Sequence, residues 1–197
     1  MRIILGCEES QTATKAFREA GHEAYSCDLE PCSGGHPEWH IQDDVLNHLS
    51  DGWDMMIAFP PCTYLTNAGV RWLYEKPGRW KKMEKGAKFF LKLLNASIKR
   101  KGIENPIPHK YALRVIGRKY DQIIQPYQFG HTEKKATCLW LDGLPLLKET
   151  NNVYDEMMKL SYRERSKVHY ASPSSERSKL RSKTYLGIAE ALAIQWG

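Results

Sequence analysis

Short apolar runs alternate with longer amphipathic segments along the chain. The apolar runs are a few residues long and end at glycine, aspartate or proline, a pattern that is typical of buried strands. We therefore expect strands over residues 2–5, 23–27, 54–59, 122–124 and 137–141, and one that leads through Ile103.

Amphipathic segments predict the helices. Ser10 or Thr12 is placed to cap a first helix that ends at Gly21, and residues 45–49 form a short helix. From Met83 apolar residues recur at helical spacing, and a last helix carries one apolar stripe from 185 to 196. Two segments lack such a pattern, so we expect a loop over 63–82 and a polar, irregular insert over 148–183.

The alternation of strands and helices predicts an α/β fold, with a mostly parallel sheet and helices on both faces. Strong composition shifts and internal repeats are absent from the sequence. We therefore expect residues 1–197 to form a single domain.

The chain is basic, with a net charge of +6, and its cations are unevenly distributed. Residues 71–120 and 159–183 carry most of them, whereas residues 1–60 hold only three. This favours a polyanionic partner such as nucleic acid, with a solvated basic surface as the alternative. No apolar run approaches the roughly 18 residues that span a bilayer, so we expect no membrane partner and a cytoplasmic protein.

Five cysteines form an odd set, which suits a compartment that keeps thiols reduced. Cys27, Cys32, His36 and His40 are spaced closely enough to raise the question of zinc. Cys27 lies in a predicted strand, however, where its side chain is buried. We therefore expect no metal site and mostly buried, free thiols.

The segment Phe59-Pro60-Pro61-Cys62 directly follows the strand over 54–59. Two consecutive prolines fix two φ angles and remove two backbone donors, so the loop is stiff and its thiol is held in place. Ligands bind at the carboxyl edge of an open α/β sheet, which is where this loop begins. Cys62 is therefore a candidate nucleophile, with a buried structural thiol as the alternative.

The segment Ile103-Glu104-Asn105-Pro106 follows Cys62 after one amphipathic helix. A thiolate that adds to C6 of a cytosine makes C5 nucleophilic, and a carboxyl group that carries a proton assists at N3. Cys62 and Glu104 are the residue types that this chemistry needs. Taken alone, the Glu-Asn-Pro sequence is also an ordinary turn.

Together these two segments resemble the paired catalytic motifs of the DNA cytosine-5 methyltransferases. The motif order along the chain resembles the compact phage- and prophage-encoded members. The resemblance implies a Rossmann-like fold that binds S-adenosylmethionine. It also implies that Cys62 is the nucleophile, that Glu104 is the acid and base-edge anchor, and that Asn105 orders the Glu104 loop.

The first half of the chain resembles the cofactor site of this family. Asp28 ends the second predicted strand, where an acidic residue binds the ribose hydroxyls, and Asp44 stands where an aspartate contacts the adenine amino group. Acidic residues after the first strand suit a sulfonium cofactor, which carries no pyrophosphate. The cofactor contacts that the resemblance implies are Gly6, Glu8, Ser10, Asp28, Leu29, Asp44 and Pro60.

Contacts to the target nucleotide are implied at Pro61, Gln128, Lys134 and Lys135. Phe129-Gly130 and the two lysines resemble a basic motif of the family, with lysine in place of arginine. The space between this motif and the last helix is too short for a target-recognition domain. The chain therefore either reads little sequence, uses a separate recognition subunit, or acts on single strands, RNA or nucleotides.

A third feature is the aromatic and basic composition of residues 71–82. Its rings, Trp72, Tyr74 and Trp80, could stack on bases while the cations contact phosphates. Packing of these rings in the core is the alternative.

These observations predict transfer of a methyl group from S-adenosylmethionine to C5 of cytosine in DNA, through a covalent bond between the cysteine and C6. One alternative is modification of RNA or of a free pyrimidine nucleotide, and another is transfer of a group other than methyl. A third is a non-catalytic module that binds nucleic acid. A phage-encoded chain would act in the cytoplasm of a bacterial host.

Overall fold

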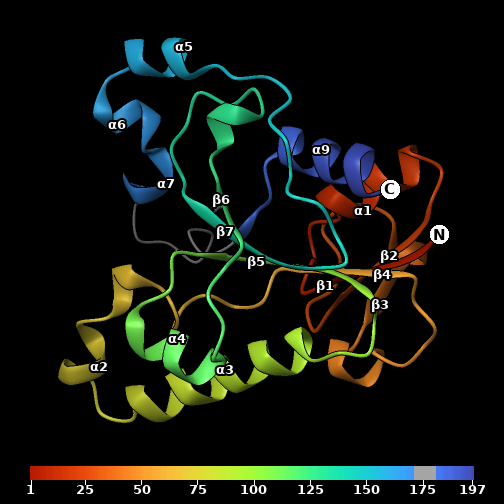
Figure 1. Ribbon diagram of the computed structural model, residues 1–197, viewed down its shortest axis with the longest axis horizontal. Helices are drawn as coiled ribbons and strands as arrows, with labels where there is room; N and C mark the ends of the chain where they lie inside the picture. Colours follow the sequence, from red (N-terminus) through yellow and green to blue (C-terminus); the bar gives the residue numbers. More distant parts are fainter. Residues whose placement is uncertain (171–180) are drawn as a thin grey trace.

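The computed structural model of the chain describes residues 1–170 and 181–197. Seven strands form a sheet in the order β3-β2-β1-β4-β5-β7-β6 (Figure 1). They are β1 (Arg2–Gly6), β2 (Glu23–Asp28), β3 (His40–Gln42), β4 (Met55–Ala58), β5 (Arg100–Pro106), β6 (Gln122–Ile124) and β7 (Thr137–Asp142). β1 to β5 run parallel, and β7 runs antiparallel to both of its neighbours. The Rossmann-like α/β fold that the sequence predicts is confirmed.

Helices cover both faces of this sheet. The longer helices are α1 (Thr12–Glu19), α3 (Arg79–Leu94), α4 (Lys110–Ile116) and α9 (Leu186–Trp196). The shorter helices are α2 (Trp72–Glu75), α5 (Tyr154–Lys159), α6 (Tyr162–Arg165) and α7 (Lys167–Tyr170). Single 3-10 turns span Pro37–Trp39, Val45–Asn47, Asn67–Gly69 and Pro126–Gln128. Within residues 1–170 and 181–197, no helix has both the length and the apolar character of a membrane span.

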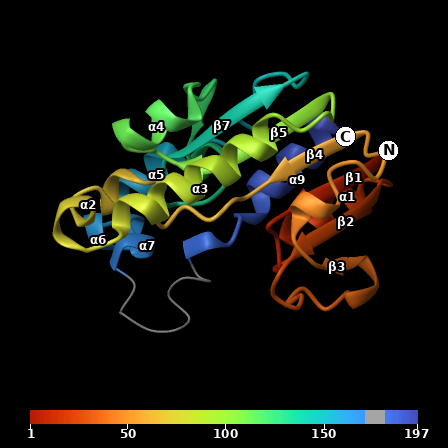
Figure 2. The ribbon, with the colours of Figure 1, turned by 90° about the horizontal axis from the view of Figure 1, so that it is seen from below.

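Alternate residues of the central strands belong to two apolar layers, one on each face of the sheet, because successive side chains of a strand point to opposite faces. In β1, Ile3 and Leu5 pack with α1 and α9, whereas Ile4 packs with α3. Figures 1 and 2 show α1 and α9 together on one face of the sheet, and α3 and α4 on the other. Burial on both faces explains why these strands are continuous apolar runs rather than alternating ones.

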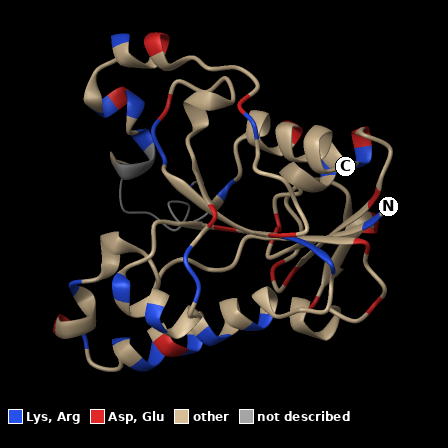
Figure 3. Ribbon diagram, in the orientation of Figure 1, with Lys and Arg blue, Asp and Glu red and all other residues tan. Residues whose placement is uncertain are grey.

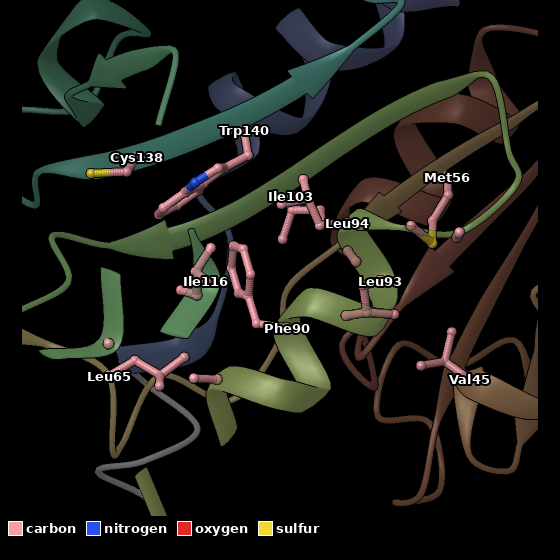
Figure 4. Packing of buried hydrophobic residues seen from close by; sticks show 14 of the residues in the cluster. Val45, Met56, Leu65, Phe90, Leu93, Leu94, Ile103, Ile116, Cys138 and Trp140 are labelled. Atoms are coloured by element: carbon pink, nitrogen blue, oxygen red, sulfur yellow. The ribbon is translucent and has the colours of Figure 1, made fainter. Parts of the chain in front are cut away.

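Between α3 and the sheet, large buried side chains from both elements pack together (Figure 4). Phe90 of α3 meets Trp140 of β7 edge to face, with 4.8 Å between the ring centres. Both rings are buried. This contact fixes the crossover helix between β4 and β5 against the sheet, and with it the two strands that carry Cys62 and Glu104.

Several predicted boundaries differ from the structure. α3 begins at Arg79 and not at Met83, and α2 lies in the segment expected to be a loop. Each addition is a single helical turn, which is too short for hydrophobic periodicity to identify, although Leu73 of α2 is buried. The insert that was expected to be irregular contains α5, α6 and α7 in its described part.

The start of α1 also differs from the prediction. Neither Ser10 nor Thr12 caps this helix. The carboxylate of Glu8 instead accepts hydrogen bonds from the backbone N–H groups of Ala13 and Thr14, at 2.6 and 3.1 Å. A carboxylate at a helix N-terminus satisfies orphan donors and interacts favourably with the helix dipole.

Candidate active site

Two neighbouring parallel strands bring the predicted catalytic residues to one edge of the sheet. In the register of β4 and β5, Ala58 pairs with Ile103. The chain that leaves β4 toward Cys62 therefore begins beside Glu104. The crossover through α3 returns the chain to the next strand, so residues about forty apart in sequence share the carboxyl edge.

Asn105 joins the two segments directly. Its side-chain amide donates a hydrogen bond to the carbonyl oxygen of Pro60, with 2.9 Å between the atoms, and the Asn105 side chain is buried. Beyond the prolines, the carbonyl oxygen of Cys62 accepts hydrogen bonds from the N–H groups of Leu65 and Thr66. Hydrogen bonds to residues before and after the thiol thus stabilise the turn that carries Cys62.

The Cys62 thiol lies in a mixed electrostatic environment. Burial raises its pKa most strongly, and the nearby Glu104 carboxylate raises it further. Lys135 and Arg181 act in the opposite direction and lower the pKa, because a positive charge favours the thiolate. The Glu104 carboxylate thus acts electrostatically on the Cys62 thiol, as expected for two groups at the same edge of the sheet.

Glu104 is positioned to hold a proton. Burial raises the pKa of its carboxyl group, while Lys135 and a hydrogen bond with the side chain of Thr137 lower it. Loss of solvent is the largest of these effects, so the pKa lies above the usual glutamate value. A carboxyl group in this state can donate a proton to a ring nitrogen at neutral pH more readily than an exposed one.

A pocket opens on the face of the sheet to which Glu104 points. It encloses about 430 Å³, including space open to solvent. Its polar wall includes Glu104, Lys135, Thr137 and Tyr185, and its apolar wall comes from β4, β6, β7 and α9. Tyr185 is fixed by a hydrogen bond from its hydroxyl group to Glu133, at 2.9 Å. The ammonium group of Lys135 lies 5.6 Å from the centre of the Tyr185 ring.

The predicted cofactor residues gather at the neighbouring strand ends. Gly6 pairs with Cys27 on one side and with Ala58 on the other. Asp28 and Asp44 both raise the pKa of the Cys7 thiol, after burial, which places the two carboxylates close to the end of β1. A Cβ atom at Gly6 would lie only 2.9 Å from a methyl carbon of Val45, so the glycine allows a close approach.

Not all of the implied cofactor residues point outward. Glu8 is only 4% exposed, and the backbone and hydroxyl groups of α1 engage its carboxylate. Its role in the structure is to cap the helix. Ser10 is half-buried, with its hydroxyl 3.2 Å from that of Thr12, and Leu29 is 70% exposed beside Asp28.

The residues implied for substrate binding lie around the same edge and differ in their exposure and hydrogen bonding. Pro61 is exposed next to Cys62. The side-chain carbonyl of Gln128 accepts a hydrogen bond from the N–H of Gln125, at 2.7 Å, as part of a turn. Lys134 is half-buried and its N–H donates to the carbonyl of Arg165. Of the two lysines, Lys135 is the one whose charge acts on both Cys62 and Glu104.

Two groups at the site are missing from the sequence-based prediction. Thr137 is the first residue of β7, and Arg181 lies near Cys62 just before the last helix. The antiparallel register of β7 brings Thr137 opposite Pro106, and this register is not visible in the sequence. Arg181 lies in the segment that was expected to be irregular, where its charge was noted only as part of a basic cluster.

The sequence matches no protein-family model and no curated protein. Similar solved structures include a proposed DNA modification methyltransferase encoded within an E. coli prophage, with a TM-score of 0.46, 12% identity and 72% of this chain covered. The methyltransferase EhMeth of Entamoeba histolytica has a TM-score of 0.49, 14% identity and 77% coverage. Dnmt2 methyltransferase of S. pombe has a TM-score of 0.47, 13% identity and 91% coverage.

The matched regions take up 46%, 57% and 62% of those three chains, respectively. The present chain thus spans about half of the length of the proteins that it resembles in structure.

Proposed function

We propose that this chain transfers a methyl group from S-adenosylmethionine to C5 of cytosine in DNA, with Cys62 as the nucleophile. The observation that carries the proposal is the hydrogen bond between Asn105 and the Pro60 carbonyl. It ties the Pro-Pro-Cys turn to the strand of Glu104, so the Cys62 thiol and a carboxyl group whose pKa is raised by burial are held at one edge of the sheet. An ordinary structural cysteine needs no such partner.

In the proposed reaction, the Cys62 thiolate forms a bond to C6 of the ring while Glu104 donates a proton to N3. The electron pair that this addition delivers to C5 would take up the methyl group, and the bond between that group and the sulfonium sulfur would break with its electrons left on the sulfur, as a neutral thioether. Loss of the C5 proton to a base then restores the C5–C6 double bond as the Cys62 thiolate leaves, and N3 returns its proton to Glu104. Lys135 favours the thiolate before addition and again at its departure, because its charge lowers the pKa of Cys62.

The residues at the ends of β1 and β2 fit the proposed cofactor. Asp28 and Asp44 supply carboxylates near Cys7, where a ribose and an amino group need hydrogen-bond acceptors. The cofactor supplies an electrophilic methyl group when bound. We assign Asp28 to the ribose hydroxyls and Asp44 to the adenine amino group, with Gly6, Ser10, Leu29 and Pro60 around them. Glu8 is left out of this set because its carboxylate caps α1.

Covalent trapping tests the proposal. The wild-type chain and Cys62→Ser are incubated with S-adenosylmethionine and DNA that contains 5-fluorocytosine, and adducts are identified by intact-mass spectrometry. Fluorine at C5 blocks the final elimination, so the cysteine stays attached to the methylated base. We expect an adduct in the wild type and none in Cys62→Ser. Cys32→Ser is the matched control, because this thiol is also partly exposed but belongs to another loop.

The absence of an adduct with DNA would contradict the proposal. The same experiment with 5-fluorocytosine in RNA and with the free nucleotide separates the alternatives. An adduct with RNA alone would assign the chemistry to a different substrate. No adduct with any of them, together with retained nucleic-acid binding, would identify a binding module.

A further inference from the structure

The outer face of α3 carries a row of lysines that the proposed chemistry does not use. Lys81, Lys85, Lys88 and Lys92 are spaced by four, three and four residues, so they lie on one side of the helix. All four are exposed, and the buried residues of α3 lie on its opposite side. Figure 3 shows this row of positive residues along the lower helix.

Within the described part of the chain, no acidic side chain neutralises these charges. Among residues 1–170 and 181–197, none of the four lysines forms an ion pair, and Glu84 is the single acidic residue of α3. From Lys81 to Lys92 the helix rises by about 16 Å, at 1.5 Å per residue. A row of this length and charge is complementary to several successive phosphates of one nucleic-acid strand.

An aromatic cluster lies at the end of α3 where this row begins. Tyr74, Trp80 and Tyr111 meet edge to face, with ring centres 5.0 to 6.2 Å apart, and the hydroxyl groups of the two tyrosines are hydrogen-bonded. The rings are far from fully packed, since Tyr74 is 67% and Trp80 38% exposed. The alternative that these rings form part of the core therefore does not apply to Tyr74 and Trp80.

Further cations surround the aromatic cluster. The ammonium group of Lys110 lies 5.2 Å from the centre of the Tyr111 ring, and the guanidinium of Arg114 lies 5.8 Å from it. Exposed rings among cations are the surface that stacks on unpaired bases while it neutralises their phosphates. The bases of a duplex are already stacked on one another, so only an unpaired strand can use the rings in this way.

This surface is joined to the Cys62 turn by Arg79. Its guanidinium donates a hydrogen bond to the carbonyl of Thr63, at 2.8 Å, and lies 4.3 Å from the centre of the Tyr64 ring. Thr63 directly follows Cys62. A nucleic-acid strand whose target base lies at Cys62 can therefore continue along the first turn of α3.

We propose that the aromatic cluster and the α3 lysines bind an unpaired polynucleotide strand and guide it to Cys62. The inference rests on the proposed function only in that the bound strand carries the target base. It specifies the substrate further, as single-stranded rather than duplex nucleic acid.

Fluorescence anisotropy tests this inference. The probes are a fluorescein-labelled oligothymidylate of about 20 nucleotides and a mixed-sequence duplex of the same length, which is longer than a typical single-strand site. Binding by the wild type is measured at several salt concentrations. Because oligothymidylate carries no cytosine, its binding does not depend on whether the chemistry at Cys62 is correct.

The test variant is the triple substitution Lys81→Ala, Lys85→Ala and Lys88→Ala. Its matched control removes three exposed lysines elsewhere, with Lys99→Ala, Lys148→Ala and Lys159→Ala. We expect the test variant to bind the single strand about tenfold or more weakly, and its plot of log Kd against log salt to lose about 2 units of slope, while the control changes little. Thermal unfolding of both variants verifies that they fold.

Substitutions in the aromatic cluster give a second, independent readout. We expect Trp80→Ala and Tyr74→Ala each to weaken single-strand binding about tenfold, with little effect on the duplex and on the salt slope. Equal or tighter wild-type binding of the duplex would overturn the inference. So would equal losses in the test and control triple variants. Binding that fits the inference, combined with a failed covalent trap, would contradict the proposed function alone.

Discussion

The side-chain amide of Asn105 donates a hydrogen bond to the carbonyl oxygen of Pro60, and both groups are buried. The other side-chain atom, Oδ1 of Asn105, is buried without a hydrogen-bond partner in the described part of the chain. Such an atom is costly in a protein interior, and the hydrogen bond to the Pro60 carbonyl offsets part of that cost.

Replacement of Asn105 by alanine should therefore destabilise the protein and loosen the turn. The Pro60 carbonyl would be left buried without its donor, which costs about 1–3 kcal/mol in the free energy of unfolding. Urea denaturation measures this loss. The control is Asn95→Ala, at an exposed position after α3, which should change stability by less than about 0.5 kcal/mol. Equal effects of the two substitutions would contradict a role for the Asn105 bond.

The reactivity of Cys62 should report its charged neighbours. Glu104→Gln removes a negative charge and should lower the pKa of the thiol, whereas Lys135→Met removes a positive charge and should raise it. The rate of iodoacetamide alkylation as a function of pH, with Cys62 identified by peptide mass spectrometry, measures both shifts. Lys88→Met is the charge-matched control, since Lys88 lies on the outer face of α3. Shifts in the same direction for Glu104→Gln and Lys135→Met would show that the charges do not act as described.

Asp28 and Asp44 should each contribute to binding of S-adenosylmethionine. Asp28→Asn and Asp44→Asn keep the size and the oxygen that accepts the N–H of Glu30 or Leu46, but remove the charge. Because hydrogen bonds to a charged acceptor contribute about 1.5–3 kcal/mol, we expect the Kd from calorimetry to rise more than about tenfold in each variant. Asp155→Asn, in exposed α5, should leave the Kd unchanged. An unchanged Kd in Asp28→Asn would remove Asp28 from the cofactor site.

Stability should fall between acidic and neutral pH because of Glu8. Burial raises the pKa of this carboxyl group from 4.5 to about 7, although its three hydrogen bonds with Ala13 and Thr14 lower it. The folded state therefore binds the proton more tightly than the unfolded state. The resulting stabilisation is full below about pH 4.5 and is lost as the pH rises to about 7.

Over this range the Glu8 contribution to the free energy of unfolding should decrease by about 3 kcal/mol. The measurement is urea denaturation from acidic to neutral pH, compared with Glu8→Gln, which keeps the side-chain size and does not titrate. The difference between the two proteins should shrink as the pH rises and stay constant above pH 7. A pH-independent difference would show that the pKa of Glu8 is the same in the folded and unfolded states, and a difference that grows with pH would show that the folded state favours the charged carboxylate.

The sequence was sufficient to predict the central strands and the meeting of Cys62 with Glu104. Buried parallel strands are continuous apolar runs, and adjacent parallel strands must end at the same edge, so both inferences depend on local pattern and simple topology. The start of α3 was not predictable in this way. Its first turn, from Arg79 to Lys82, is mostly exposed, so no periodic apolar signal marks it.

Side-chain partners were predicted less well than backbone elements. Glu8 was expected to contact the cofactor, but its carboxylate accepts three hydrogen bonds from Ala13 and Thr14 and caps α1. The direction of this side chain depends on the backbone turn before α1, which the sequence does not specify. Cys7 and Gln11, on either side, have positive φ angles without being glycine, so the turn conformation had no sequence marker.

The reversed direction of β7 has a consequence for how the site can vary. Residues that follow a parallel strand lie at the carboxyl edge of the sheet. Because β7 is antiparallel, its first residue, Thr137, and Lys135, which precedes it, lie at that edge instead. The position of this cation is thus set by the length of the turn before β7, independently of the turn that carries Cys62. A change of one residue in that preceding turn would move the cation along the pocket wall while the nucleophile stayed in place. Thiol reactivity and substrate fit can therefore be adjusted by separate loops on the same sheet.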